Sequence, residues 1–190
     1  MEQRSEEWFN ARLGLITGSQ VSKVLLKPGS KTRDTYMNQL LTERIYQIPP
    51  DNSWAEHNVH VARGVALEPL AIAEYTKVTG NAVMGWGMER HALYAIGYSP
   101  DGLVGTDGMI EVKCPIRFSG GVPDKYLPQM RLGMYVMKRK WCDYVEYVDS
   151  QARIVRVHLN LPEQQNILNK CFEFLAELDN LYYTSIKDRR

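Results

Sequence analysis

Residues 99–113 constrain the fold more than any other part of this 190-residue chain. They contain Ser-Pro-Asp-Gly-Leu-Val, the turn sequence Gly-Thr-Asp-Gly, and then Met-Ile-Glu-Val-Lys. Two short apolar runs joined by a turn rich in Gly and Asp predict a β-hairpin. This hairpin would carry Asp101 at the start of its first strand and Glu111 and Lys113 on its second strand.

The length of the turn decides whether the two carboxylates share a face of the sheet. A three-residue loop over residues 106–108, with Gly108 left-handed, would place Leu103 opposite Glu111. Asp101 would then lie on the same face, about 7 Å away diagonally. A two-residue loop would put the carboxylates on opposite faces. We therefore expect a loop with an odd number of residues, or a local break in the strand that the proline and glycine flanking Asp101 would permit.

The residue types in this hairpin suit metal-dependent cleavage of a phosphodiester. In an extended Glu-x-Lys segment Lys113 projects beside Glu111, while Val112 points into the core. Carboxylates such as Asp101 and Glu111 are the hard ligands of a divalent cation, which can activate water, and Lys113 could orient that water or stabilise developing charge. The alternative is an ordinary surface ion pair between Glu111 and Lys113, worth roughly 0–1 kcal/mol.

Further runs occur in order along the chain: Trp-Phe-Asn-Ala-Arg-Leu-Gly-Leu-Ile-Thr-Gly-Ser at 8–19, Gly-Val-Ala-Leu-Glu at 64–68, and Tyr-Leu-Pro-Gln-Met at 126–130. Together with the hairpin, over roughly residues 4–160, they closely resemble the phage lambda exonuclease-like viral recombinases (alkaline exonucleases). That family lies within the PD-(D/E)xK nuclease superfamily. The resemblance is strongest at the Arg-Leu-Gly-x-Ile-Thr, Ser-Pro-Asp-Gly-Leu and Glu-x-Lys-Cys-Pro runs.

The resemblance implies a role for each matched position. The metal would be bound by Asp101, Glu111, the Val112 carbonyl and Glu68, and Lys113 and Gln129 would act with Glu111 and Asp101 in catalysis. The 5′-phosphate and the DNA would be contacted by Arg12, Ser19, Thr17, Trp8, Tyr126, Lys27, Lys31 and Arg33. The family has an arginine where this chain has Gly29, so the basic residue in 27–33 that contacts DNA stays open.

Several of these residues also have purely structural interpretations. Arg12 could pair with Glu6 or Glu7 at helical spacing. Residues 17–20 fit a capping box, which is compatible with phosphate binding because a helix N-terminus attracts anions. Trp8 could be buried in the core instead of stacking on end bases. Tyr126 and Gln129, three residues apart on a predicted helix, could be core-edge residues.

Composition excludes several other classes of protein. The chain is 44% hydrophobic and 24% charged with a net charge of +1, which is ordinary for a soluble globular domain. No apolar run reaches the roughly 18 residues that span a bilayer, and the charged start is no signal peptide, so we expect no membrane contact and a cytoplasmic location. Three scattered cysteines predict neither disulfides nor a zinc site.

Residues 113–140 carry seven basic side chains against one acid, which suits a phosphate backbone.

The periodicity predicts one α/β domain with a mixed central β-sheet flanked by helices. The resemblance implies that this domain has a PD-(D/E)xK restriction-endonuclease-like core. Its expected parts are N-terminal helices in 1–60, a catalytic core in 61–160 and a C-terminal helix in 161–190. We expect a short helix that begins at Ser5, and further helices after 17, at 36–45, through Glu68 to Gly80, at 124–137 and from Pro162. The expected strands lie near 92–99, 103–104, 109–114, 142–148 and 152–159.

The residues favour an enzyme that cleaves DNA with Mg²⁺, or alternatively Mn²⁺. The resemblance implies that it digests the 5′ strand of linear double-stranded DNA and leaves 3′ single-stranded tails. Two alternatives stay open: a structure-specific endonuclease or resolvase with the same centre, and a non-catalytic protein that binds DNA ends. The resemblance also implies a ring-shaped homotrimer and a single-strand annealing protein as partner. Neither follows from the residues themselves.

Overall fold

A five-stranded mixed sheet in the order β2-β5-β6-β7-β8 forms the centre of the computed structural model, which describes residues 2–49 and 58–187. Strands β6 and β7 are parallel, and the other neighbouring pairs are antiparallel. The bounds of the strands are Val83–Met84 (β2), Gly102–Val104 (β5), Gly108–Lys113 (β6), Trp141–Val148 (β7) and Gln151–His158 (β8). The predicted α/β class with a mixed sheet is therefore confirmed.

A second sheet of three short strands lies beside the first, in the order β1-β4-β3. Its strands are Ile16–Thr17 (β1), Glu89–Arg90 (β3) and Ile96–Tyr98 (β4). Strand β4 is parallel to β1 and antiparallel to β3. The expected strand near 92–99 is confirmed as β4, whereas β1, β2 and β3 were not predicted.

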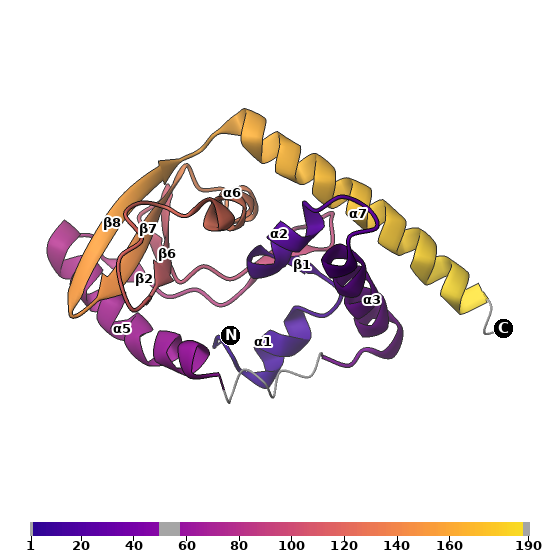
Figure 1. Ribbon diagram of the computed structural model, residues 1–190, viewed down its shortest axis with the longest axis horizontal. Coiled ribbons are helices and arrows are strands. Elements are labelled where there is room, and N and C mark those ends of the chain that lie inside the picture. The colour runs from indigo at the N-terminus through magenta and orange to yellow at the C-terminus, as the bar shows by residue number, and fades with distance from the viewer. Residues whose placement is uncertain (1, 50–57, 188–190) are drawn as a thin grey trace.

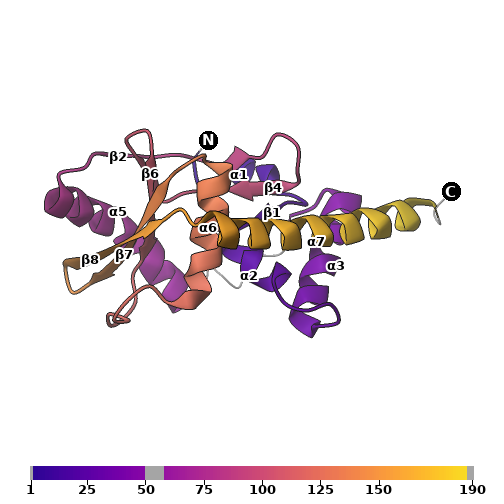
Figure 2. The same cartoon turned by 90° about the horizontal axis from the view of Figure 1, so that it is seen from above.

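Helices cover both faces of the large sheet, with α5 and α6 on opposite sides of it (Figures 1 and 2). None of the helices in the described part of the chain is long and apolar enough to span a membrane. The helices and 3₁₀ turns are α1 (Glu6–Ala11), η1 (Gly18–Gln20), α2 (Val21–Val24), α3 (Lys31–Tyr46), α5 (Val59–Thr79), η2 (Asp124–Tyr126), α6 (Leu127–Val136) and α7 (Leu161–Lys187).

Helix α5 begins and ends at residues suited to those positions. The side chain of Asn58 accepts hydrogen bonds from the backbone N–H groups of His60 and Val61, and the left-handed Gly80 follows the last turn, as predicted. Helix α5 starts at Val59, before residue 61, where the catalytic core was expected to begin. Residues 50–57 lie outside the described residues.

Side chains alternate along β6 between the two faces of the sheet. Ile110 and Val112 pack with Ala71 and Tyr75 of α5, which confirms that Val112 points into the core. Met109 packs in the other cluster, with residues of α6 and α7. Glu111 and Lys113 therefore face the α6 side, where Tyr144 and Glu146 of β7 lie in register with them.

The turn between β5 and β6 is a three-residue loop, as expected, but it covers residues 105–107 instead of 106–108. Its left-handed residue is Gly105, with φ at 53°, so the expectation for Gly108 is wrong. The glycine at the first loop position relieves the strain of positive φ.

The strand register follows from this shifted loop. Leu103 pairs with Met109, not with Glu111 as predicted. Continuing the register by one residue places Asp101 opposite Glu111, and the odd loop keeps both on one face, as predicted.

Helix α7 runs from the end of β8 across α6 and α3, and its C-terminal end extends to the edge of the molecule (Figures 1 and 2). Pro162 is its second residue, which confirms the predicted start, and the side chain of Asn160 accepts a hydrogen bond from the N–H of Glu163. One stripe of side chains at helical spacing is buried: Gln164, Ile167, Leu168, Cys171, Phe174, Leu175 and Leu178.

Candidate active site

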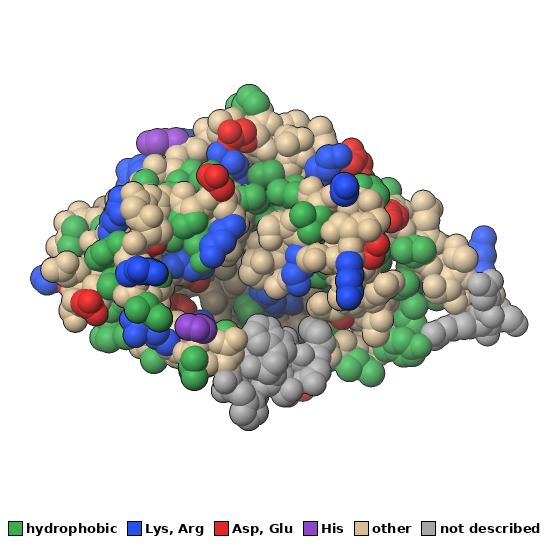
Figure 3. Space-filling model, viewed as in Figure 1, with side chains coloured by type: hydrophobic (Ala, Val, Ile, Leu, Met, Phe, Trp, Pro, Cys, Tyr) green, Lys and Arg blue, Asp and Glu red, His purple; other side chains and the backbone are tan. Residues whose placement is uncertain are grey.

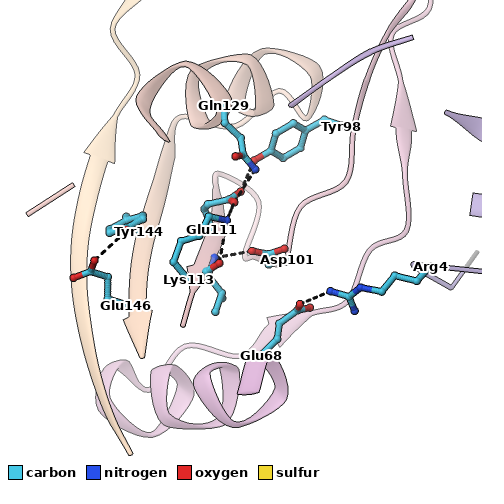
Figure 4. Close-up of polar contacts among 10 residues, drawn as sticks. Arg4, Glu68, Tyr98, Asp101, Glu111, Lys113, Gln129, Tyr144 and Glu146 are labelled. Carbon is cyan, nitrogen blue, oxygen red and sulfur yellow. Dashed lines mark hydrogen bonds and ion pairs between the residues drawn. The ribbon is translucent and has the colours of Figure 1, made fainter. Parts of the chain in front are cut away.

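Glu111 is held by three side chains that donate hydrogen bonds to its carboxylate (Figure 4). The Tyr98 hydroxyl donates to Oε2 over 2.9 Å, and the Gln129 amide donates to Oε1 over 2.7 Å. The Lys113 ammonium pairs with Oε1 and also donates to the carbonyl of Val112 over 3.1 Å. Glu111 is only 1% exposed, so its carboxylate is fixed in orientation and compensated in charge.

Lys113 keeps its positive charge in this environment. Burial lowers the pKa of its ammonium, but the carboxylates of Glu111 and Asp101 outweigh that effect and raise the pKa above its ordinary value. The side chain of Lys113 is 26% exposed, so the ammonium can still reach a group that enters the adjacent cavity.

Asp101 approaches the same point from the segment before β5. Its Oδ2 accepts a hydrogen bond from the N–H of Val112 over 2.6 Å. Burial is the largest cause that raises the pKa of Asp101, to about 8. The negative charges of Glu111 and Glu68 act in the same direction, whereas Lys113 and the hydrogen bond from Val112 oppose them. Ionised Asp101 is therefore costly in this fold unless a cation compensates its charge.

A cavity of about 550 Å³ opens beside these groups. Asp101, Val112 and Lys113 line it from the hairpin, and Glu68 lines it from α5. The Glu68 carboxylate forms an ion pair with Arg4 over 2.7 Å (Figure 4). The third predicted acid is thus in the same cavity as Asp101, and a protein cation neutralises it.

Tyr126 forms a wall of the cavity next to Lys113. The ammonium groups of Lys113 and Lys125 lie 5.2 and 4.8 Å from the centre of its ring, and Tyr144 stacks on it at 5.7 Å. The π face of a tyrosine attracts both cations. Tyr126 therefore positions positive charge at the cavity mouth, and together with Gln129 it lies at the site, as the sequence predicted.

A second, smaller cavity of about 150 Å³ shares Tyr126 and Lys125 with the first. Ser19 of η1 lines it with Ser22, Lys125 and Gln129. Two hydroxyls and one ammonium are groups that can hold a phosphate.

The predicted DNA-binding residues of α1 and β1 form a connected group near this cavity. The Arg12 guanidinium lies 4.0 Å from the centre of the Trp8 ring and donates to the Thr17 hydroxyl over 3.3 Å. Trp8 is half-buried, and its indole N–H donates to Ser99 over 2.8 Å. Arg12 thus pairs with Trp8 and Thr17, not with Glu6 or Glu7. Thr17 makes no side-chain capping hydrogen bond to η1, so the capping box is not formed.

The basic residues in 27–33 lie in different environments. Arg33 is 4% exposed, pairs with Glu177 over 2.6 Å and lies over the ring of Phe174, so it fastens α3 to α7. This burial corrects the expectation that Arg33 contacts DNA. Lys27 and Lys31 are exposed, and neither is among the residues that line the two cavities.

The centre supplies oxygen donors, the type of ligand that hard divalent cations prefer. Two carboxylates on one face, the Val112 carbonyl and Glu68 in the same cavity are all oxygen donors, and burial with the nearby charges of Glu111 and Glu68 disfavours an ionised Asp101 that has no cation beside it. Within residues 2–49 and 58–187, no three side chains of Asp, Glu, His or Cys are close enough to form a complete metal cage. A main-chain carbonyl and a movement of Glu68 would be needed to complete the ligand set.

Three residues of the site were not predicted from the sequence. They are Tyr98, which donates to Glu111, Arg4, which pairs with Glu68, and Glu146, which is 1% exposed. Glu146 accepts hydrogen bonds from the hydroxyl of Tyr144 and the N–H of Ser119 over 3.1 Å each. An acid within the apolar run of β7 was a usable signal for Glu146, whereas Tyr98 and Arg4 are brought in only by the tertiary fold.

The fold and the carboxylate–lysine centre define a class of viral recombinases and exonucleases. A family model for the YqaJ-like viral recombinase domain matches residues 7–140, and the chain belongs to this family. No curated protein matches the chain.

Solved structures agree with this assignment. An alkaline exonuclease from Laribacter hongkongensis (LHK-Exo) is 33% identical with a TM-score of 0.89, over 97% of this chain and 98% of that chain. A structure of LHK-Exo in complex with dAMP is also 33% identical, with a TM-score of 0.88 over the same shares. A phage-related exonuclease from Haemophilus somnus 129PT, 14% identical with a TM-score of 0.69 over 93% of this chain and 96% of that chain, shares the fold.

Proposed function

We propose that this protein is a divalent-metal-dependent exonuclease that digests the 5′ strand of linear double-stranded DNA and leaves 3′ single-stranded tails. One observation carries the proposal: Asp101 and Glu111 lie on one face of the hairpin, with Lys113 and Gln129 bound directly to Glu111. Membership of the YqaJ-like viral recombinase family supports the same chemistry.

Each side chain of the centre has a proposed part in hydrolysis. Asp101, Glu111 and the Val112 carbonyl would hold Mg²⁺ or Mn²⁺, with Glu68 completing the set, and Lys113 and Gln129 would contact the reacting groups. The cation, when bound, would supply Lewis acidity and lower the pKa of a bound water. Lys113 keeps a proton on Nζ and can stabilise negative charge on the phosphoryl oxygens. Because the Gln129 amide is fixed by Glu111, its position does not depend on the substrate.

The smaller cavity is the proposed site of the 5′-phosphate. Ser19 and Lys125 line it, and Arg12 is held nearby through Thr17, which precedes Gly18 of the cavity wall. Trp8 would stack on or wedge against the end bases. Figure 3 shows Lys and Arg side chains on either side of a hollow near the middle of this face, a charge distribution that suits a nucleic-acid backbone. Among the remaining predicted contacts, Lys27 and Lys31 are exposed enough to meet DNA farther away.

We extend the proposal to assembly and partners. The chain would form a homotrimer around DNA, act in the cytoplasm, and pass its 3′ tails to a single-strand annealing protein. Sedimentation equilibrium tests the first of these, because a trimer would have three times the 21.8 kDa mass of the chain. A mass equal to one chain at all concentrations would contradict it.

Digestion of end-labelled linear duplexes, with and without a 5′-phosphate, tests the function. In Mg²⁺ we expect release of mononucleotides from the 5′ end, faster with the phosphate, and none in EDTA. Asp101→Asn should lower the rate by roughly 10²–10³-fold or more, because it removes a charged ligand of the centre. Glu173→Gln, at an exposed position on α7, is the matched control and should leave the rate unchanged.

Two results would contradict this function. Cutting of a circular duplex at the same rate would favour the endonuclease or resolvase. Tight binding of DNA ends without cleavage in either metal would favour a non-catalytic end-binding protein.

A further inference from the structure

Arg4, in the segment before α1, reaches the large cavity and contacts Glu68. Its guanidinium lines the large cavity and pairs with Oε2 of Glu68 over 2.7 Å (Figure 4). The side chains of Arg4 and Glu68 are 46% and 22% exposed, so solvent and small ions reach the pair. A protein cation is thus bound to one of the carboxylates proposed to complete the metal site.

The backbone at Arg4 is in a conformation that residues other than glycine rarely adopt, with φ at 68°. Contacts on both sides of Arg4 hold this conformation. The Gln3 amide donates to the carbonyls of Trp86 and Pro100 over 3.0 and 2.8 Å, and the Ser5 hydroxyl donates to the Glu2 carbonyl over 2.7 Å. Because Pro100 precedes Asp101, these contacts fix Arg4 on the Asp101 side of the cavity.

The other cations of the cavity make different contacts. Arg63 donates to the carbonyls of Cys114 and Pro115, both over 3.4 Å, and Lys113 pairs with Glu111. Arg4 is the cation that directly neutralises Glu68. A divalent ion and the Arg4 guanidinium would therefore compete for the same carboxylate, of which Arg4 already holds Oε2.

We propose that Arg4 is a positioning residue that competes with the divalent cation for Glu68 and thereby sets the metal affinity of the centre. In the metal-free protein Arg4 holds the Glu68 carboxylate. When a cation binds, Arg4 releases Glu68 and turns toward solvent. The inference rests on the proposed metal-dependent function, because it requires that Glu68 contributes to metal binding.

Calorimetric titration with Mn²⁺, using the full-length protein without DNA, tests this competition. Asn tolerates the left-handed backbone and carries no charge, so Arg4→Asn removes the competing cation without adding strain. We expect Arg4→Asn to bind Mn²⁺ roughly two- to tenfold more tightly than the wild type. Arg4→Gly suits the same backbone and should give the same change if Arg4→Asn folds poorly.

A double-mutant cycle separates direct competition from a general effect of charge. In a Glu68→Gln background, Arg4→Asn should no longer tighten Mn²⁺ binding. Arg63→Gln removes a positive charge from the same cavity without freeing a carboxylate, so it should tighten binding less than Arg4→Asn does. An equal effect of Arg63→Gln, or an undiminished effect of Arg4→Asn in the Glu68→Gln background, would overturn the inference.

The experiment also distinguishes failure of the inference from failure of the function. Mn²⁺ binding by the wild type with unchanged affinity in Arg4→Asn and Arg4→Gly would overturn the role of Arg4 alone. Absence of any Mn²⁺ binding by the wild type would overturn the proposed metal centre, and the role of Arg4 with it.

Discussion

At the scale of single residues, Asp101 is a carboxyl group that is costly to ionise in the metal-free protein. Its carboxylate lies near the negative charges of Glu111 and Glu68, and the hydrogen bond from the N–H of Val112 offsets only some of the cost. Asn can still accept that hydrogen bond but carries no charge. We expect Asp101→Asn to raise the free energy of unfolding in EDTA by about 1–3 kcal/mol.

Urea denaturation at neutral pH measures this change. Asp124→Asn, at an exposed position, serves as control and should shift the free energy of unfolding by less than about 0.5 kcal/mol. If Asp101→Asn is less stable than the wild type in EDTA, the charge of Asp101 is already fully compensated by its neighbours.

Tyr98 is predicted to stabilise Glu111 through its hydroxyl. Burial raises the pKa of Tyr98 well above its ordinary value, and the charge of Glu111 adds to this, so the hydroxyl keeps its proton and donates. Tyr98→Phe should lower the free energy of unfolding by roughly 1–3 kcal/mol and slow single-turnover cleavage more than it weakens DNA binding. Tyr94→Phe, at an exposed residue, is the matched control. Equal stability of Tyr98→Phe and wild type would show that Glu111 does not need this donor.

The sequence predicted which residues of the site belong together better than it predicted their partners. Asp101, Glu111 and Lys113 lie within one hairpin, so strand periodicity was enough to bring them to one face. The alternative that paired Arg12 with Glu6 or Glu7 was wrong, because stacking on Trp8 competes with ion pairs at helical spacing. The resemblance left open whether Lys27, Lys31 or Arg33 contacts DNA, and the burial of Arg33 could not be predicted locally because its partner Glu177 is far along the chain.

At the scale of secondary-structure elements, the packing of α6 depends on a glycine. A Cβ at Gly133 would lie 2.4 Å from the Tyr98 ring and 2.7 Å from Met109. Gly133→Ala should therefore destabilise the protein by about 1–3 kcal/mol, although alanine favours helices. Because α6 carries Gln129, the substitution should also slow cleavage.

Gly64 of α5 is the matched control for Gly133. Apart from its chain neighbours and the nearby backbone of α5, no atom of the described residues lies within 4 Å of a Cβ built at Gly64. Gly64→Ala should raise the free energy of unfolding by up to about 1 kcal/mol, because only helix propensity changes. Thermal unfolding of both variants tests the pair, and destabilisation of equal size in both would contradict the packing argument.

Long elements were predictable from sequence and very short ones were not. Helix α7 and strand β8 each present several repeats of their side-chain period, so the pattern is clear. Strands β1, β2 and β3 have two residues each, too few to show alternation. The β5–β6 loop was shifted by one residue because either glycine of Gly-Thr-Asp-Gly could take the left-handed position.

At the scale of the whole molecule, a single apolar cluster joins the two sheets. It includes Ile16 and Tyr98 from the small sheet, Met109 and Tyr144 from the large sheet, and Phe174 from α7. Contacts through one core couple the stability of the elements that share it. This supports the predicted single domain and explains how the small sheet can hold Tyr98 against Glu111 of the large sheet.

The shared core predicts one cooperative unfolding transition. Far-UV circular dichroism and tryptophan fluorescence should give the same urea midpoint, because strands β5, β6 and β7 contribute side chains to this cluster and to the cluster under α5. Phe174 is fully buried against Tyr36, and Phe174→Ala should lower the free energy of unfolding by about 3–5 kcal/mol and shift both probes together. Separate midpoints for the two probes, or a shift of only one of them in Phe174→Ala, would mean that the sheets unfold as independent units. In that case Tyr98 could leave Glu111 without global unfolding, and the centre would be stable only while the small sheet stays folded.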